Sequence, residues 1–289
     1  MPADARVGVV VLTHNRAQEV AGTLERLCAL PECPRIVVVD NASTDGTPDL
    51  LRHRFPDLVC LCLATNAGAA GRNVGVRACD RPYVALCDDD TWWEPGALRH
   101  AADLLDAHPQ LAVVSATVLV RKEERIDPIC WEMARSPLCA TLGLPGAPLL
   151  GFLAGASIVR RSAFLAVGGF EPRLFLGAEE QLLAIDLARA GWALAYVAEL
   201  IVHHYPSPQR DAQARLRLLA RNALWIAWLR RPLGRALRMT ARAVRRSRRD
   251  RVVRAALAEA LPGLPWALRH RQVVSAALEQ QLRLIDHDC

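Results

Sequence analysis

Short apolar runs alternate with amphipathic stretches over the first 120 residues of the chain. The runs are rich in β-branched residues and predict buried strands, and the stretches between them have helical spacing. Because parallel strands need long crossovers, the alternation predicts an α/β fold whose mainly parallel sheet is flanked by helices. The expected strands are Val7–Leu12, Ile36–Val39, Leu58–Leu63, Tyr83–Cys87 and Leu111–Val120, and the expected helices are Ala17–Leu30, Asp49–Arg54, Ala69–Cys79 and Pro95–Ala107.

The pattern breaks at Arg121–Pro148, where repeated prolines leave little regular structure expected. Long inserts of this kind in compact domains are usually functional or mobile. Apolar structure resumes at Phe152–Val159, and a helix near Ala178–Ala190 and a strand near Ala193–Val197 are expected after it. Pro206 then marks a boundary, beyond which the spacing predicts only helices.

The segment 206–289 is expected to be a basic, amphipathic helical tail. Residues 210–289 contain 18 Lys/Arg and 6 Asp/Glu, whereas residues 1–209 contain 18 and 24. Three uses of the tail stay open: packing of its apolar face on the rest of the chain, contact with an anionic membrane surface, and homodimer formation. No nucleic-acid-reading module is recognised, so nucleic acid is not an expected partner.

The composition indicates a globular protein. Apolar residues make up 52% and charged residues 23% of the 289 residues, which excludes wholesale disorder. No apolar run reaches the ~18 residues of a membrane span. The N-terminal residues lack the features of a secretory signal, and the nine cysteines have no zinc-like spacing. We therefore expect a soluble, cytoplasmic protein with free thiols.

Polar residues follow three of the expected strands, at the sheet edge where α/β proteins bind ligands. They are Thr13–Arg16, Asp40–Thr47 and the triple acid Asp88–Asp90. Three adjacent carboxylates repel one another, and oxygen ligation by Mg²⁺ or Mn²⁺ would relieve the repulsion. The alternative is a solvated acidic turn that caps the helix near Pro95.

A glycine-rich segment, Asn66–Gly75, opens another expected helix. Free backbone N–H groups at such a position favour an anion. The alternative is a helix start that packs tightly on the sheet. The segment is neither GxxxxGK[ST] nor GxGxxG, so ATPase and dehydrogenase functions lose support.

Taken in order, five motifs resemble those of a family-2 glycosyltransferase over about residues 6–205. They are Val9–Arg16, Val37–Thr47, Asn66–Gly75, Asp88–Asp90 and Gly168–Phe170. The resemblance implies a GT-A fold with a nucleotide-sugar-binding half (1–110), an acceptor-binding half (111–205) and a C-terminal helical extension. It also implies a bacterial-type, metal-dependent, inverting transferase that uses a UDP-sugar donor and a hydroxyl acceptor on a glycan, a lipid-linked glycan or a natural product.

The same resemblance implies roles for individual residues on the donor side. Asp40 would accept a hydrogen bond from the uracil N3–H, and Asn41 would flank it. Asp90 would bind Mn²⁺ or Mg²⁺ with Asp88, and His203 or His204 could also contact the metal. The remaining residues expected around the nucleotide-sugar are Thr13, His14, Arg16, Asn66, Gly68, Arg72 and Asp89.

On the acceptor side, the resemblance assigns the catalytic base to Glu180, with Glu179 as a substitute. Leu182 and Asp186 depart from the family pattern, which affects the acceptor more than the reaction type. The insert Arg121–Pro148 could form a lid or an acceptor wall. The expected acceptor and sugar pocket comprises Gly155, Ala156 and Trp92.

Each of these features also has an explanation that involves only the stability of the fold. Acids favour the first turn of a helix through its dipole, so the glutamate pair could be structural. Small residues such as Gly155 could only permit strand packing, and Trp92 could only fill core. For the whole chain, the alternative functions are a nucleotidyltransferase on a similar fold and a catalytically silent sugar-nucleotide-binding scaffold.

Overall fold

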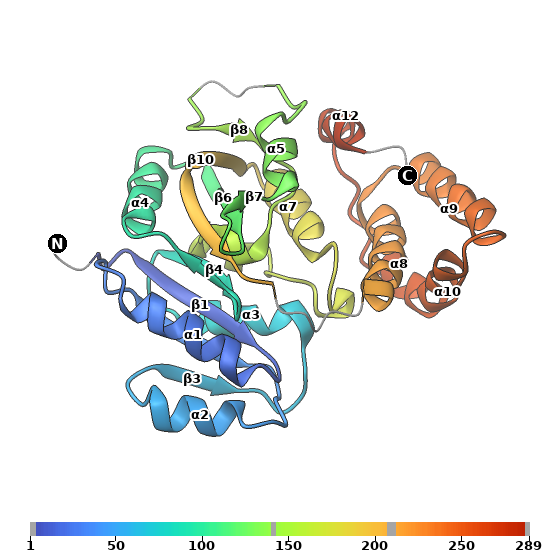
Figure 1. Cartoon of the computed structure of the whole chain (residues 1–289). Helices are drawn as coiled ribbons and strands as arrows, with labels where there is room; N and C mark the ends of the chain where they lie inside the picture. The colour runs from blue at the N-terminus through green and yellow to red at the C-terminus, as the bar shows by residue number, and fades with distance from the viewer. Residues whose placement is uncertain (1–3, 140–142, 207–211, 287–289) are drawn as a thin grey trace.

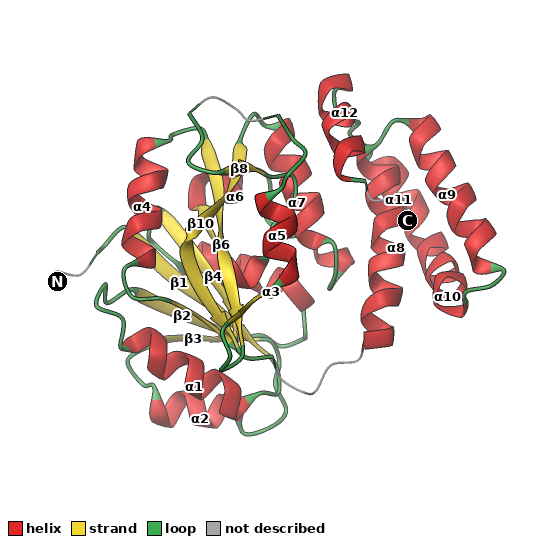
Figure 2. Cartoon of the chain, turned by 45° about the horizontal axis from the view of Figure 1, so that its top comes forward, coloured by secondary structure: helices red, strands yellow, loops and turns green. Residues whose placement is uncertain are grey.

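The computed structural model describes residues 4–139, 143–206 and 212–286. Within these residues, ten strands form one sheet with the order β3-β2-β1-β4-β9-β6-β10-β5, and β7 and β8 pair with β6 and β10. Helices flank this sheet, as Figure 2 shows. The strands are β1 Val7–Thr13, β2 Arg35–Asp40, β3 Val59–Cys62, β4 Tyr83–Asp88, β5 Thr91–Trp93, β6 Leu111–Val120, β7 Arg125–Ile126, β8 Ala147–Pro148, β9 Ser157–Arg160 and β10 Ala193–His204.

The sheet is mixed and mainly parallel, as expected, with the antiparallel strand β9 near the middle of the strand order. Strands β3, β2, β1 and β4 are mutually parallel, and β6 is parallel to β10. Strand β9 lies antiparallel between β4 and β6. Because β9 is antiparallel to both of its neighbours, β4 and β6 run in the same direction. The carboxyl ends of β1, β2, β4, β6 and β10 therefore all lie at the same edge of the sheet. Loops at that edge can therefore build one shared site.

The predicted helices form, with ends that differ by a few residues. A tight contact explains the glycine within α3, because a Cβ at Gly75 would lie 2.4 Å from Cγ1 of Val10 on β1. The helices are α1 Ala17–Cys28, α2 Thr47–Arg54, α3 Gly71–Ala78, α4 Ala97–Ala107, α5 Pro128–Ala134, α6 Arg161–Ala166, α7 Glu179–Arg189, α8 Ala212–Arg230, α9 Leu233–Ser247, α10 Arg251–Ala260, α11 Leu264–Arg269 and α12 Ala276–Ile285, and short 3-10 turns occur at Gly68–Ala70, Ala154–Ala156, Pro172–Leu174 and Leu261–Gly263.

The prediction of little regular structure at Arg121–Pro148 is wrong in part. The insert contains β7, β8 and the helix α5. Pro128 is the first residue of α5, a position whose backbone N–H has no partner within the helix, so a proline is tolerated there. Asp127 caps the helix by accepting from the Ile129 N–H. Strand β5 was not predicted, because three residues directly after an acidic turn give no periodic signal.

The tail forms helices α8–α12 beside α7 (Figure 1). Its apolar side joins a second hydrophobic cluster, in which Leu182 and Ile185 of α7 meet Trp225 and Leu229 of α8. Packing on the rest of the chain, the first of the three expected uses of the tail, is therefore observed. Across the described residues, no helix combines the length and apolarity needed to cross a bilayer.

Candidate active site

The three adjacent aspartates follow β4 at the shared sheet edge, and each has a different environment. Asp88 is 39% exposed and forms an ion pair with Arg72. Asp89 pairs with Arg16 at 2.8 Å, and Asp90 lies 3.4 Å from the same guanidinium. Two arginines thus relieve much of the mutual repulsion, so the repulsion by itself does not require a metal.

Asp89 points inward. Its Oδ2 accepts a hydrogen bond from Thr13 Oγ1 at 3.1 Å, and its backbone carbonyl accepts one from Thr23 Oγ1 at 2.8 Å. Burial raises the pKa of Asp89 to about 6, although Arg16 opposes the shift. The carboxylate that was expected at the nucleotide therefore anchors the acidic turn to β1 and α1, together with Thr13 and Arg16.

Asp90 and His204 bring together ligands that suit a metal. Nε2 of His204 lies 3.5 Å from Oδ1 of Asp90, close to the ~3 Å that separates neighbouring ligands of an octahedral ion. His203 instead approaches Glu94 at 2.5 Å and stacks on Trp92. Of the two histidines, only His204 faces the acidic turn in this way.

No three His, Cys, Asp or Glu side chains form a ready-made metal cage within the described ranges. An incomplete set fits Mg²⁺ or Mn²⁺, which commonly combine one or two carboxylates with substrate phosphates. Asp88, Asp90 and His204 are the residues that fit such an ion.

Asp40, at the end of β2, is 2% exposed. Its Oδ2 accepts a hydrogen bond from the Ser43 N–H at 3.2 Å, whereas its Oδ1 is buried without a hydrogen-bond partner. A buried carboxylate oxygen without a donor is costly. The site therefore offers an acceptor to a ligand N–H group.

Asn41 braces the glycine-rich segment instead of presenting its amide to solvent. Its Oδ1 accepts from the Ala67 N–H at 2.8 Å, and its Nδ2 donates to the Gly68 carbonyl at 3.0 Å. Asn66 closes the same turn by accepting from the Gly68 N–H. Both asparagines shape the loop. His14, which follows β1, has a buried Nδ1 without a hydrogen-bond partner.

Arg72 of α3 links the acidic turn to the glutamate pair. Its guanidinium bonds Asp88, and the charges of Asp88, Glu179 and Glu180 all act on it. Burial lowers the pKa of Arg72, but these carboxylates outweigh burial and leave that pKa raised. The two acidic groups, almost a hundred residues apart in the sequence, therefore share one cation.

Glu179 and Glu180 begin α7. Glu179 is 3% exposed, and its Oε2 is buried without a hydrogen-bond partner. Burial raises the pKa of both glutamates, and the charge of Glu179 adds to the rise at Glu180, which reaches about 8. A carboxylate with a raised pKa is a stronger base than an ordinary glutamate, so the pair is chemically suited to accept a proton.

Gly155 and Ala156 lie against the acidic turn. A Cβ at Gly155 would approach Oδ2 of Asp88 to 2.7 Å, so only glycine allows this close approach. Trp92 is engaged elsewhere, with Arg26 4.2 Å from its ring centre and His203 stacked at 5.5 Å. We therefore assign Trp92 to packing and not to the expected acceptor pocket.

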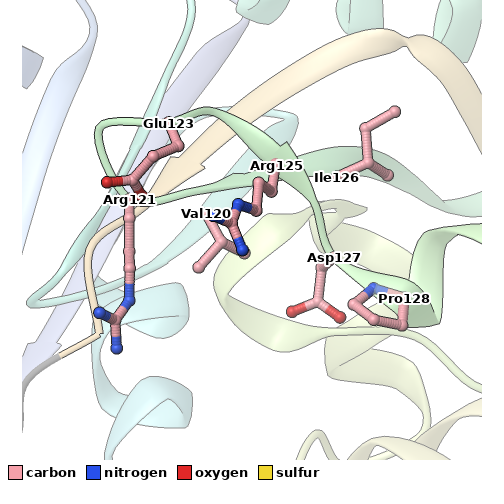
Figure 3. A pocket seen from close by; sticks show the side chains of 7 residues that line it. All are labelled: Val120, Arg121, Glu123, Arg125, Ile126, Asp127 and Pro128. Atoms are coloured by element: carbon pink, nitrogen blue, oxygen red, sulfur yellow. The ribbon is translucent and has the colours of Figure 1, made fainter.

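A hollow of about 480 Å³ lies in the insert beyond β6 (Figure 3). Arg121 and Arg125 border it, and the Arg121 N–H donates to the His204 carbonyl at the end of β10. The hollow thus adjoins the strand that carries the histidine pair. Its lining residues are Val120, Arg121, Glu123, Arg125, Ile126, Asp127 and Pro128.

The two departures from the family pattern coincide with the docking of the tail. Leu182 is buried in the second hydrophobic cluster. Asp186 accepts two hydrogen bonds from Arg230 of α8, at 2.5 and 2.8 Å. An apolar residue and an acid therefore serve the contact with α8 at these positions.

The sequence did not point to Arg221 and Asn222 of α8, which bond the turn before Glu179. Asn222 interrupts the apolar side of an otherwise regular helix. A polar amide at such a position needs hydrogen-bond partners when it is buried, and this is the one signal in the sequence that could have indicated its role. Thr23 of α1 was missed as well, since a threonine within a helix carries no special pattern.

Comparison with known proteins agrees with this geometry. The family description "Glycosyl transferase family 2" matches residues 8–168, more than half of the chain. An N-acetylglucosaminyl-diphospho-decaprenol L-rhamnosyltransferase of Mycobacterium tuberculosis is 28% identical over 84% of this chain and 96% of that protein. A pre-mycofactocin glycosyltransferase of the same organism is 30% identical over 74% of this chain, which spans 46% of that protein.

Solved structures support the fold. Mannosyltransferase PcManGT from Pyrobaculum calidifontis, in complex with GDP-Man and Mn²⁺, superposes with a TM-score of 0.59 at 23% identity, covering 98% of this chain and 76% of that one. S. aureus TarS gives a TM-score of 0.56 at 22% identity, covering 76% of this chain and 40% of that one. The sheet has the GT-A architecture, and with the match over residues 8–168 this places the chain in glycosyltransferase family 2.

Proposed function

We propose that this protein transfers a sugar from a nucleoside-diphosphate donor to an acceptor hydroxyl with inversion at the anomeric carbon. The observation that carries the proposal is the position of Arg72. Its guanidinium bonds Asp88, and the charges of Glu179 and Glu180 raise its pKa. This arrangement supports a proposed donor-diphosphate site next to a proposed catalytic base. We further propose residues 1–205 as the catalytic unit, divided near residue 110, and 206–289 as its extension.

The donor base is proposed to be uracil. Oδ1 of Asp40 is buried and without a hydrogen-bond partner, and the N3–H group of uracil is a donor of the required kind. The similar S. aureus TarS has been solved in complex with UDP-GlcNAc. Thymine carries the same N3–H, so a thymidine-diphosphate sugar is the related donor to test.

Mn²⁺ or Mg²⁺ is proposed to bind Asp90, Asp88 and His204. When bound, the ion would neutralise charge on the departing diphosphate. Arg72 and Arg16 contribute positive charge at the same edge through their ion pairs with the aspartates. Two of the similar solved structures contain Mn²⁺.

Glu180 is proposed as the general base. Its carboxylate accepts the proton of the acceptor hydroxyl while the acceptor oxygen bonds the anomeric carbon and the nucleoside diphosphate leaves with the bonding electron pair. The raised pKa of Glu180 suits this step. Glu179, buried beside it, tunes that basicity through its charge and is the alternative base.

The acceptor is proposed to be a glycan linked to a lipid. The rhamnosyltransferase relative is named for a decaprenol-diphosphate-linked acceptor, and the alignment covers nearly all of that protein. The hollow in the insert combines Arg121 and Arg125 with Glu123 and Asp127 beside apolar Ile126, a lining that suits polar sugar groups next to an apolar chain.

The tail is proposed to contact the membrane surface from the cytoplasmic side. On α9, Leu233, Leu237 and Val244 are 55%, 52% and 47% exposed and occupy one stripe of the helix. Arginines occupy the other side of the helix, with Arg238 and Arg245 nearer the stripe than Arg242. An exposed apolar stripe on a strongly basic helix suits an interface of anionic lipid, to which each basic residue adds about 1 kcal/mol at low salt.

The test is a donor-panel assay that follows nucleoside-diphosphate release with Mn²⁺ present. We expect release from UDP- or dTDP-sugars, loss of metal-dependent donor binding in Asp90→Ala, and donor binding without turnover in Glu180→Gln. Consumption of a nucleoside triphosphate would support the nucleotidyltransferase alternative instead. Donor binding without release from any sugar nucleotide would support the silent scaffold.

A further inference from the structure

Asn222 of α8 is fully buried and directs its side-chain amide at the turn before the acidic pair. Its Nδ2 donates to the carbonyls of Leu174, Leu176 and Gly177 at 2.9, 3.2 and 2.5 Å. The two amide hydrogens are thus shared among three acceptors. A helix more than forty residues further along the chain therefore holds this turn.

The turn has an unusual backbone. Phe175, Gly177 and Ala178 have φ angles of +62°, +88° and +65°. Residues other than glycine adopt such angles only where the surrounding structure imposes them. Ala178 directly precedes Glu179 and Glu180 in the first turn of α7. The conformation of the turn therefore sets where the two carboxylates lie.

Arg221 orients the amide of Asn222. Its Nε donates to Oδ1 of Asn222 at 3.0 Å, and its Nη2 donates to the Leu174 carbonyl at 2.9 Å. The guanidinium itself lies 4.4 Å from the ring centre of Trp225. A flipped amide would lose the bond from Arg221 and all three bonds to the turn, so the arrangement has one orientation.

The opposite side of the turn touches the donor-side loop. The Phe175 carbonyl accepts from the Ala69 N–H at 2.6 Å. A Cβ at Gly68 would lie 2.1 Å from that same carbonyl oxygen, so the loop and the turn are in close contact. The turn is thus held between the glycine-rich segment and α8, and α8 bonds it through the side chains of Arg221 and Asn222.

We propose that Asn222, oriented by Arg221, is a positioning residue for sugar transfer: through the turn Leu174–Ala178, the tail helix α8 sets the placement of Glu180. The inference rests on the proposed role of Glu180 as the base. On this proposal the C-terminal extension contributes to catalysis through α8. This contribution does not depend on what α9 to α12 contact.

The test is Asn222→Ala in the full chain. A base displaced by about 1 Å can cost about a hundredfold in rate, so we expect kcat to fall by about tenfold to a hundredfold. The donor KM and the Kd for UDP with Mn²⁺ should change far less than kcat, because Asn222 bonds the turn and not the residues proposed to hold the donor base and the metal. The acid limb of the pH profile should shift, and amides 175–180 should exchange hydrogen faster.

The matched control is Arg230→Gln, which breaks the bond between α8 and Asp186 without touching the turn. It should lower the melting temperature and leave kcat and the acid limb in place. If kcat of Asn222→Ala is normal, or if both variants lose kcat equally, the inference is overturned. If Asn222→Ala does not fold, Arg221→Met takes its place, with the same readouts and the same deciding outcomes.

Glu180→Gln separates this inference from the proposed function. Normal turnover in Glu180→Gln refutes the assignment of the base itself. Loss of turnover in Glu180→Gln together with normal kcat in Asn222→Ala leaves the base in place and refutes only the role of α8.

Discussion

Replacing Asp40 by asparagine should reverse the hydrogen-bonding character of the proposed site for the donor base. The Ser43 N–H needs an acceptor, so the amide oxygen of the new side chain will keep that 3.2 Å bond. The amide nitrogen then occupies the place of the unpartnered Oδ1. A donor would face the uracil N3–H, and the two donors cannot pair.

The size of the effect follows from the bond that is lost. A hydrogen bond to a charged group contributes about 1.5–3 kcal/mol, which corresponds to about 10- to 150-fold in Kd. Asp40 is only 2% exposed, so water cannot replace the missing acceptor. The N3 atom of cytosine is an acceptor, so CDP should lose less affinity than UDP, or gain affinity.

Isothermal titration of UDP and CDP with Mn²⁺ measures both changes. The free variant should not be less stable than the wild type, because the substitution removes a buried charge while keeping the Ser43 bond. Asp45→Asn is the matched control, since Asp45 accepts from the Thr47 N–H at 2.9 Å and has no proposed contact with the donor, and it should bind UDP normally. A UDP affinity that is unchanged in Asp40→Asn would refute the assignment of Asp40 to the base.

Further predictions concern the acidic groups and the tail. Gly155→Ala should push the Asp88 carboxylate, which a Cβ would meet at 2.7 Å, and lower kcat/KM by about tenfold to a hundredfold; an unchanged value would contradict the close approach. Because the base must be deprotonated and the pKa of Glu180 is raised from 4.5 to about 8, kcat/KM should rise with pH above the range of an ordinary glutamate and then level off. Chelation with EDTA should abolish the rise in melting temperature that UDP and Mn²⁺ cause together, and a shift that survives EDTA would argue against a metal. Leu237→Glu on α9 should weaken co-sedimentation with anionic vesicles at low salt without changing donor release, and equal binding by the variant would remove α9 from the membrane contact.

Much of the donor side could be predicted from the sequence, because it depends on local order. The strands that place Thr13, Asp40 and Asp88 are apolar runs followed at once by polar residues, and the pairing of β1, β2 and β4 confirms their parallel arrangement. The roles of the individual side chains were less predictable. Asn41 and Asp89 have the right residue types for ligand contacts, yet the structure uses them to brace a loop and the acidic turn.

The choice between the two histidines was beyond sequence reasoning. His203 and His204 are adjacent on a strand, so their side chains must point to opposite faces. Only the register of β10 against β5 and β6 decides which face meets Asp90. The helix in the insert was missed for a similar reason. Pro128 is at the start of α5, and the number of prolines in a segment does not show whether one of them begins a helix or interrupts one.

By itself, the sequence determined the α/β class, the glycine-rich helix start and the order of motifs that marks the family, because each depends on residues close together in the chain. The tertiary structure alone decided that Arg72 bonds Asp88 within reach of the charge of Glu180 and that Asn222 holds the turn before the proposed base. Interactions between residues 45 to 108 positions apart depend on how whole elements pack, and packing is a property of complementary surfaces that no local pattern contains.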